Sequence, residues 1–183
     1  MGRTSENVGP FIHCRRLQKT QSLKTDITLT RLFILISVIT KVFMHNKQKA
    51  IQQINEQGPK LIGLLGGQLI DFDTEKTACT FEFNISKDYC HSIDIVQGGF
   101  VTAMLDAAMS HAIFISNEDI KNVSSLEIKT SYLEATRAGK LRVEGWVIKQ
   151  SYKTAFMEGR VYNEKNELTA TASSVAKILR APK

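Results

Sequence analysis

Residues 94–109, DIVQGGFVTAMLDAAM, combine two adjacent glycines with a carboxylate, Asp106, that stands among Ala, Met, Leu and Val. A carboxylate in apolar surroundings is costly unless another group pairs with it or a reaction uses it. Gly99 to Ile115 has no Pro and is too long for an ordinary strand, which predicts a helix. The free N–H groups at a helix start suit an oxygen that becomes negative, so Gly98 and Gly99 could form an oxyanion hole.

Asp106 lies eight residues beyond Gly98, which is about 12 Å along a helix at 1.5 Å per residue. One small carbonyl group cannot contact both residues in the same subunit. The spacing therefore predicts a dimer, in which each helix start faces the middle of its partner's helix. The alternative is a structural role, with the Asp106 carboxylate satisfied by the backbone or by Ser110.

The predicted helix carries two stripes at i, i+4 spacing. The polar stripe is Thr102, Asp106 and Ser110, and the small-residue stripe is Gly99, Ala103 and Ala107. Most other positions are large and apolar, which is typical of a buried helix. Asp106 is thus expected on a narrow polar seam, at an interface or a pocket.

The surrounding segments predict one sheet. MHNKQKAIQQINEQGP, from residue 44, is typical of an amphipathic helix that ends at Gly58-Pro59. LIGLLGGQLIDFD and KTACTFEFNIS read as a hairpin, and SSLEIKTSYLEA, GKLRVEGWVIKQ and a hairpin over residues 154–179 follow the long helix. In SSLEIKTSYLEA the alternation places Leu126, Ile128 and Thr130 on one face. Short connections favour an antiparallel sheet with the apolar helix packed on it, an α+β fold.

Composition and charge narrow the possible partners. The formal charge of the 183 residues is +6, but residues 1–43 hold seven Lys/Arg and two Asp/Glu, so the remainder carries only +1. This lacks the concentrated basic footprint of a nucleic-acid domain. Three scattered cysteines without CxxC spacing favour a reducing compartment, and a cytoplasmic location is expected.

The N-terminal extension, residues 1–43, is separated from the expected domain, residues 44–183. Its apolar run from Leu32 to Thr40 is half the roughly 20 residues that a membrane span needs, so stable membrane insertion is not expected. The Arg- and Ser-bearing start fits a transit peptide better than a signal peptide. We favour an accessory extension, or sequence upstream of an alternative start at Met44.

Residues 61–179 resemble the hotdog-fold acyl-CoA thioesterases of the phenylacetate-degradation (PaaI-like) family. The family motif is Asn-x-x-Gly-x-x-His-Gly-Gly with an Asp or Glu eight residues after the first Gly of the final pair, and Gly98 and Asp106 match it. The resemblance implies a curved antiparallel sheet wrapped around a central helix. It also implies a homodimer, or a tetramer made of two dimers, with active sites that span two subunits.

The resemblance also implies roles for individual residues. The Gly98 N–H would polarise the thioester carbonyl, and Asp106 would act as general base on water or as nucleophile. Ser125 would help to place the water or the acid. Gln97 stands where the family has His, and His91 stands where it has Asn; both are kept as catalytic candidates. The remaining substrate-binding candidates are Gly99, Ser110 and Phe100.

The sequence therefore predicts hydrolysis of a CoA thioester to free acid and CoA. A thioester has a good thiolate leaving group, so neither metal nor organic cofactor is expected. Four basic residues are candidates for the phosphates of CoA: Arg137, Lys140, Lys177 and Arg180. The alternatives are a non-catalytic binding protein for acyl-CoA or acyl carrier, which the Gln97 and His91 departures favour, and a hotdog enoyl hydratase, whose longer motif is missing.

Overall fold

The computed structural model describes residues 36, 44–115, 117 and 119–182. The chain divides into two compact units, Met1–Lys49 and Ala50–Lys183. Apart from Ile36, the N-terminal extension expected at residues 1–43 lies outside the described residues. The helix expected from residue 44 is confirmed, because residues 44–57 are helical and Gly58 and Pro59 follow them.

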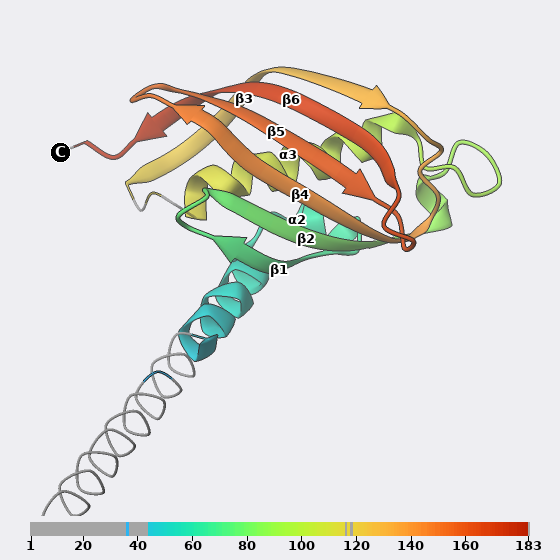
Figure 1. The fold of residues 1–183 in the computed structure, drawn as a ribbon, viewed down its shortest axis with the longest axis horizontal. Helices are drawn as coiled ribbons and strands as arrows, with labels where there is room; N and C mark the ends of the chain where they lie inside the picture. Colours follow the sequence, from blue (N-terminus) through green and yellow to red (C-terminus); the bar gives the residue numbers. More distant parts are fainter. Residues whose placement is uncertain (1–35, 37–43, 116, 118, 183) are drawn as a thin grey trace, which may run out of the picture. The chain divides into compact units, whose positions relative to one another are not determined.

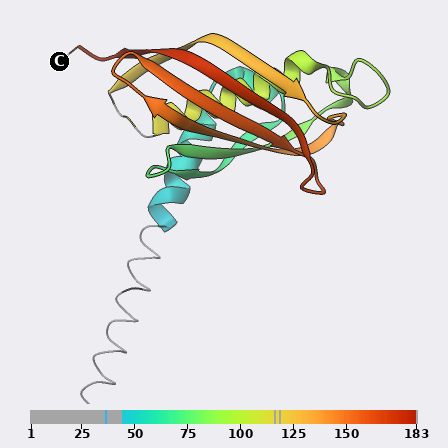
Figure 2. The ribbon, with the colours of Figure 1, turned by 45° about the horizontal axis from the view of Figure 1, so that its top comes forward.

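The second unit is built on a six-stranded antiparallel sheet in the order β1-β2-β4-β5-β6-β3. The strands are β1 (Gly67–Asp73), β2 (Ala78–Ile85), β3 (Ile120–Tyr132), β4 (Gly139–Gln150), β5 (Thr154–Tyr162) and β6 (Leu168–Arg180). The helices are α2 (Lys60–Leu64), η1 (Lys87–Tyr89) and α3 (Gly98–Ile115). The sheet curves around α3, as Figures 1 and 2 show. The predicted antiparallel α+β architecture is confirmed.

The segment expected as one strand, LIGLLGGQLIDFD, divides into α2 and β1. Gly66 makes the division possible because its φ is +71°, a conformation that glycine adopts without strain. A Cβ at Gly66 would also lie 2.4 Å from the carbonyl oxygen of Asn84. The single strand expected here is therefore wrong where α2 stands, because the apolar pattern does not reveal this close approach between distant segments.

The outer edge of β1 is covered by a side chain of the helix over residues 44–57. Asn55 Nδ2 donates to the Leu69 carbonyl at 3.0 Å, and the Leu69 N–H donates to Asn55 Oδ1 at 2.8 Å. One amide side chain thus replaces a missing strand partner at this position. Covering an edge in this way protects it from pairing with another chain.

The core of the unit lies between α3 and the sheet. Seven side chains of α3 are buried: Val101, Met104, Leu105, Ala108, Met109, Ala112 and Ile113. α3 is the one described helix long and apolar enough to cross a membrane by length and composition, yet it contacts five strands, as a core helix does. The close backbone approach occurs at Ala108, one position from the small-residue stripe, where a Cβ on Gly145 of β4 would lie 2.4 Å from the Ala108 carbonyl carbon.

Candidate active site

The start of α3 is fixed by the residue before it and leaves two amides available. The backbone carbonyl of Gln97 accepts hydrogen bonds from the N–H groups of Phe100, at 2.9 Å, and Val101, at 3.4 Å. The backbone N–H of Gln97 donates to the Tyr89 carbonyl at 2.9 Å. Among the described residues, no hydrogen bond uses the N–H of Gly98 or Gly99. These groups lie at the positive end of the helix dipole, where they can bind an anionic oxygen.

Asp106 lies two turns further along α3 and is half-buried. Ser125 Oγ of β3 donates to Asp106 Oδ1 at 2.7 Å. No Lys, Arg or His within the described part of the chain forms an ion pair with this carboxylate. The partner of Asp106 is therefore Ser125 rather than Ser110. The carboxylate can still accept a further hydrogen bond, for example from water.

A β-bulge in β3 brings Ser125 to Asp106. Ser125 pairs with Ala176 and Glu127 with Val175, so Leu126 is an extra residue opposite the regular strand β6. A bulge of this kind re-aims the side chains on either side of it. The expected alternation is wrong at this point, because Leu126 is 65% exposed instead of sharing the inner face with Thr130.

Hydroxyl groups of β3 also contact the first turn of α3. Tyr132 Oη donates to the Gly98 carbonyl at 2.8 Å and lies 2.9 Å from Thr102 Oγ1. Thr102 Oγ1 lies 3.0 Å from Thr130 Oγ1. Tyr132 and Thr130 were not among the predicted site residues. The available signal was their i, i+2 spacing on one strand face, opposite the polar stripe that begins with Thr102.

The other predicted residues lie apart from this cluster or beside it. Ser110 is half-buried one turn beyond Asp106 and forms no hydrogen bond with it. Phe100 packs edge-on against Tyr89, with ring centroids 4.8 Å apart. His91 is exposed on the loop before α3, where its backbone N–H donates to the Ile95 carbonyl at 3.0 Å. The structure thus joins Asp106 to Ser125 and leaves His91 without a described contact to either.

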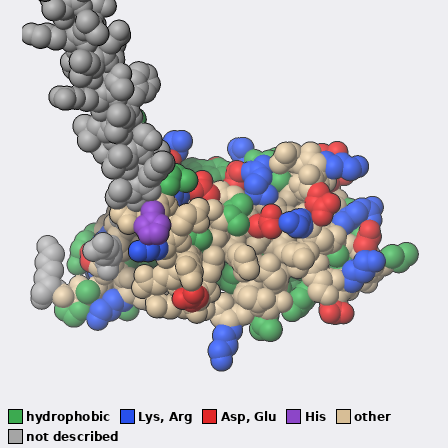
Figure 3. All heavy atoms as spheres, turned by 90° about the horizontal axis from the view of Figure 1, so that it is seen from below, with side chains coloured by type: hydrophobic (Ala, Val, Ile, Leu, Met, Phe, Trp, Pro, Cys, Tyr) green, Lys and Arg blue, Asp and Glu red, His purple; other side chains and the backbone are tan. Residues whose placement is uncertain are grey.

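The candidate phosphate-binding cations are partly engaged elsewhere. Arg137 pairs with Asp94 at 2.6 Å, Lys140 pairs with Glu82 at 3.4 Å, and Arg180 pairs with Asp119 at 2.7 Å. Basic and acidic side chains are also interspersed on the face seen in Figure 3. No single cationic patch is formed by these three side chains.

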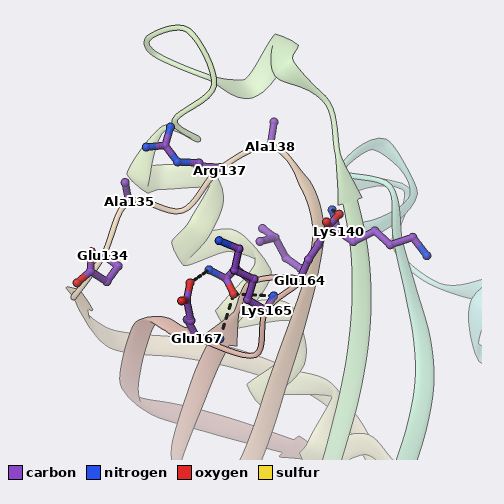
Figure 4. Close-up of a pocket in the computed structure, with 10 residues that line it drawn as sticks. Glu134, Ala135, Arg137, Ala138, Lys140, Glu164, Lys165 and Glu167 are labelled. Carbon is purple, nitrogen blue, oxygen red and sulfur yellow. Dashed lines mark hydrogen bonds between the residues drawn. The ribbon is translucent and has the colours of Figure 1, made fainter.

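A hollow of about 710 Å³ lies between the loop after β3 and the β5–β6 turn (Figure 4). Its charged lining is mixed: Glu134, Arg137, Lys140, Glu164, Lys165 and Glu167. Neither Gly98 nor Asp106 lines it. The hollow therefore belongs to a different part of the surface from the Asp106–Ser125 pair.

Cys79 offers little nucleophilic chemistry. Cys79 is buried against α3, and its Sγ donates to the Ala108 carbonyl at 3.1 Å. Burial raises the pKa of the Cys79 thiol, which keeps it protonated and unreactive. Among the described residues, no group of three or more His, Cys, Asp or Glu side chains is placed to hold a metal ion.

Comparison with known proteins supports the same fold. Residues 94–170 match the family model described as the thioesterase superfamily. No curated protein matches the chain significantly. A phenylacetic acid degradation-related protein from Ralstonia eutropha is 25% identical, with a TM-score of 0.62 over 66% of this chain and 90% of its own.

Two further solved structures are similar at lower identity. A thioesterase from Haemophilus influenzae is 16% identical, with a TM-score of 0.65 over 73% of this chain and 92% of its own. The PaaI protein of the E. coli phenylacetic acid degradation operon is 14% identical, with a TM-score of 0.64 over 73% and 94%. The predicted hotdog fold is confirmed by these likenesses.

Proposed function

We propose that this chain, which has the hotdog fold and whose residues 94–170 match the thioesterase superfamily model, hydrolyses an acyl-CoA thioester to the free acid and CoA. The observation that carries the proposal is the Asp106–Ser125 pair, with its 2.7 Å hydrogen bond and no cationic partner among the described residues. A carboxylate held by one hydroxyl is a suitable general base for water. The free Gly98 and Gly99 amides supply the matching oxyanion site.

The proposed reaction is addition of water followed by loss of thiolate. Asp106 accepts a proton from water while the water oxygen bonds to the thioester carbonyl carbon. The carbonyl oxygen becomes negative and is held by the Gly98 N–H. The carbon–sulfur bond then breaks, and the CoA thiolate leaves with the proton that Asp106 took up. Ser125 keeps the carboxylate oriented throughout.

The proposed site is shared between two subunits. Gly98 and Asp106 lie eight residues apart on the single helix α3, about 12 Å at the helical rise. The outer edge of β3 has no strand partner in the described sheet, and Leu126 and Tyr132 on β3 are exposed. A homodimer that pairs these edges would cover the apolar side chains and bring one subunit's Gly98 toward the other's Asp106; two such dimers could assemble as a tetramer.

The test is thiol release from a panel of acyl-CoAs by the wild type and by Asp106→Asn. Removing a general base is expected to lower kcat about 10²- to 10⁴-fold with little change in KM. Asp88→Asn is the matched control, because Asp88 also accepts a serine hydroxyl, from Ser86 at 2.8 Å, but lies on exposed η1. Equal turnover by wild type and Asp106→Asn would contradict the mechanism.

The second candidate is a protein that binds acyl-CoA or acyl carrier without turnover. Gln97 and His91 favour it, because they stand where the resembling enzymes have His and Asn. Titration calorimetry with the same acyl-CoA panel separates the two functions. Binding without thiol release by the wild type, on every chain length and on an aromatic acyl group, would favour the binding protein.

A further inference from the structure

The hydroxyl group of Tyr132 lies at the start of α3, next to the proposed oxyanion site. It is 2.8 Å from the Gly98 carbonyl oxygen, and a Cβ at Gly98 would lie only 2.8 Å from it. Within a single subunit Tyr132 is nevertheless 53% exposed, so little apolar burial from its own chain holds it there. Its placement therefore depends on its polar contacts.

These contacts form a chain of hydrogen bonds in which each hydroxyl donates to the next group, ending at the Gly98 carbonyl. A carbonyl oxygen can only accept, so the single hydroxyl proton of Tyr132 goes to Gly98. The contact of 2.9 Å between Thr102 and Tyr132 is then donated by Thr102. By the same count, the contact of 3.0 Å between Thr130 and Thr102 is donated by Thr130.

The acceptor at the end of this chain belongs to the same peptide group as the Gly99 N–H. Because a peptide group is planar, fixing the Gly98 carbonyl also fixes the direction of the Gly99 N–H. A hydrogen bond to the carbonyl further polarises the group, and successive bonds in a chain strengthen one another. The Gly99 N–H has no partner among the described residues and lies at the positive end of α3.

We propose that Tyr132 is a positioning residue that orients and strengthens the Gly99 N–H as a second oxyanion donor, with Thr102 and Thr130 supporting its hydroxyl. This proposal rests on the proposed thioester hydrolysis and deepens it. Gly98 would contribute its own N–H directly, whereas Tyr132 acts through the Gly98–Gly99 peptide. The arrangement also explains why residue 98 has no side chain, since a Cβ would displace Tyr132.

The first test compares wild type with Tyr132→Phe, which keeps the ring and removes the hydroxyl. Loss of a complete oxyanion donor costs about 10²- to 10³-fold in kcat, so loss of its support is expected to cost about 5- to 30-fold. KM should change by less than about twofold, because the donor acts on the developing oxyanion. Tyr152→Phe is the control, since the Tyr152 side chain is 64% exposed and lies outside the site.

A second pair of variants keeps Tyr132 itself. Thr102→Val removes the hydroxyl that donates to Tyr132 at nearly constant volume, and Thr102→Ser retains it. The valine variant should show part of the decrease in kcat expected for Tyr132→Phe. The serine variant should keep a kcat close to that of the wild type. Equal kcat in both Thr102 variants would overturn the role of the hydroxyl chain.

The amide resonances provide a readout that needs no turnover. Tyr132→Phe should shift the ¹⁵N resonance of Gly99 and leave that of Gly66, at the α2–β1 turn, in place. An unshifted Gly99 resonance would overturn the inference whatever the activity. A shifted resonance with wild-type kcat in an active enzyme would overturn the catalytic role. A shifted resonance in a chain that releases no thiol would instead contradict the proposed hydrolysis and leave Tyr132 as an orienting group for a bound carbonyl.

Discussion

At the scale of single residues, Asp106 is explained by what surrounds it. It is half-buried on an apolar helix, accepts one hydroxyl at 2.7 Å and has no described cationic partner. A carboxylate that has only a structural role usually forms more hydrogen bonds or an ion pair when it is withdrawn from water. One serine orients the group and leaves acceptor capacity, which suits the proposed base.

Ser125→Ala is expected to lower kcat about 10- to 100-fold while KM stays within about twofold, because a hydrogen bond to a charged group contributes about 1.5–3 kcal/mol. Steady-state thiol release measures both constants. Ser124→Ala is the matched control, since Ser124 is the neighbouring exposed serine on the other face of β3. An equal loss of kcat in both variants would indicate a general disturbance of β3 instead of an effect on Asp106.

His111 is expected to make the fold sensitive to mild acid. Burial lowers the pKa of His111, and the hydrogen bond with the Ala107 carbonyl at 2.8 Å opposes this only partly. The unfolded chain therefore binds a proton more readily, and the free energy of unfolding falls as the pH drops below about 6.5 toward the lower folded pKa. Urea titrations between about pH 8 and 5 should show a flatter profile for His111→Gln. The same slope in both proteins would refute this contribution.

At the scale of elements, β3 and α3 make the candidate site together. β3 is antiparallel to β6 and carries Ser125, Thr130 and Tyr132 toward the helix, and the extra residue Leu126 lets odd- and even-numbered positions share that face. A regular strand would have directed Ser125 away from Asp106. The irregularity in β3 therefore positions the site.

α3 can lie this close to the sheet because β4 has a glycine opposite it. A Cβ at Gly145 would lie 2.4 Å from the Ala108 carbonyl carbon and 2.5 Å from the Met109 nitrogen. Gly145→Ala is expected to lower the free energy of unfolding by about 1–3 kcal/mol or more, because backbone atoms cannot move aside as a side chain can. Chemical denaturation measures the loss.

The matched control is Gly63→Ala in α2, where an added Cβ meets no atom within 4 Å. Alanine also favours helix over glycine by about 1 kcal/mol. The control should therefore be as stable as the wild type or slightly more stable. A tolerant Gly145→Ala would show that α3 can move away from β4, which would contradict the tight packing described for this contact.

At the scale of the whole molecule, the proposed dimer makes a distinctive prediction for mixed variants. Gly98→Pro keeps a helix-compatible backbone at the first helical position but removes its N–H and adds a Cβ that displaces Tyr132, so it disables the proposed oxyanion side of the site. Asp106→Asn removes the proposed base. Each homodimer should be inactive. A heterodimer would hold one intact site, made of Gly98 from one subunit and Asp106 from the other.

Unfolding and refolding an equimolar mixture of the two variants should restore about a quarter of the wild-type activity, since half the dimers are mixed and each has one of two sites intact. Thiol release and gel filtration on the same sample provide the measurement. A mixture as inactive as its components would contradict a site shared between subunits. Wild type carried alone through the same unfolding and refolding is the control for recovery of activity.

The sequence by itself determined the order of elements and the central feature of the site. Strand alternation, the hairpin pattern over residues 154–179 and the proline-free apolar run predicted β4, β5, β6 and α3, because each depends on local periodicity. The glycine pair and the isolated Asp106 were conspicuous for the same reason: a polar or flexible residue in an apolar helix is unusual without a partner.

Only the tertiary structure decided which residues meet. The bulge at Leu126, the approach of Tyr132 to Gly98 and the turn at Gly66 each depend on contacts between segments far apart in the chain. No periodicity within a single segment encodes such contacts, because a strand's register is set by its neighbour and by the helix beneath it. The sequence thus supplied the carboxylate, the helix start and, through the family resemblance, Ser125, and the fold added the hydroxyls of Thr130 and Tyr132.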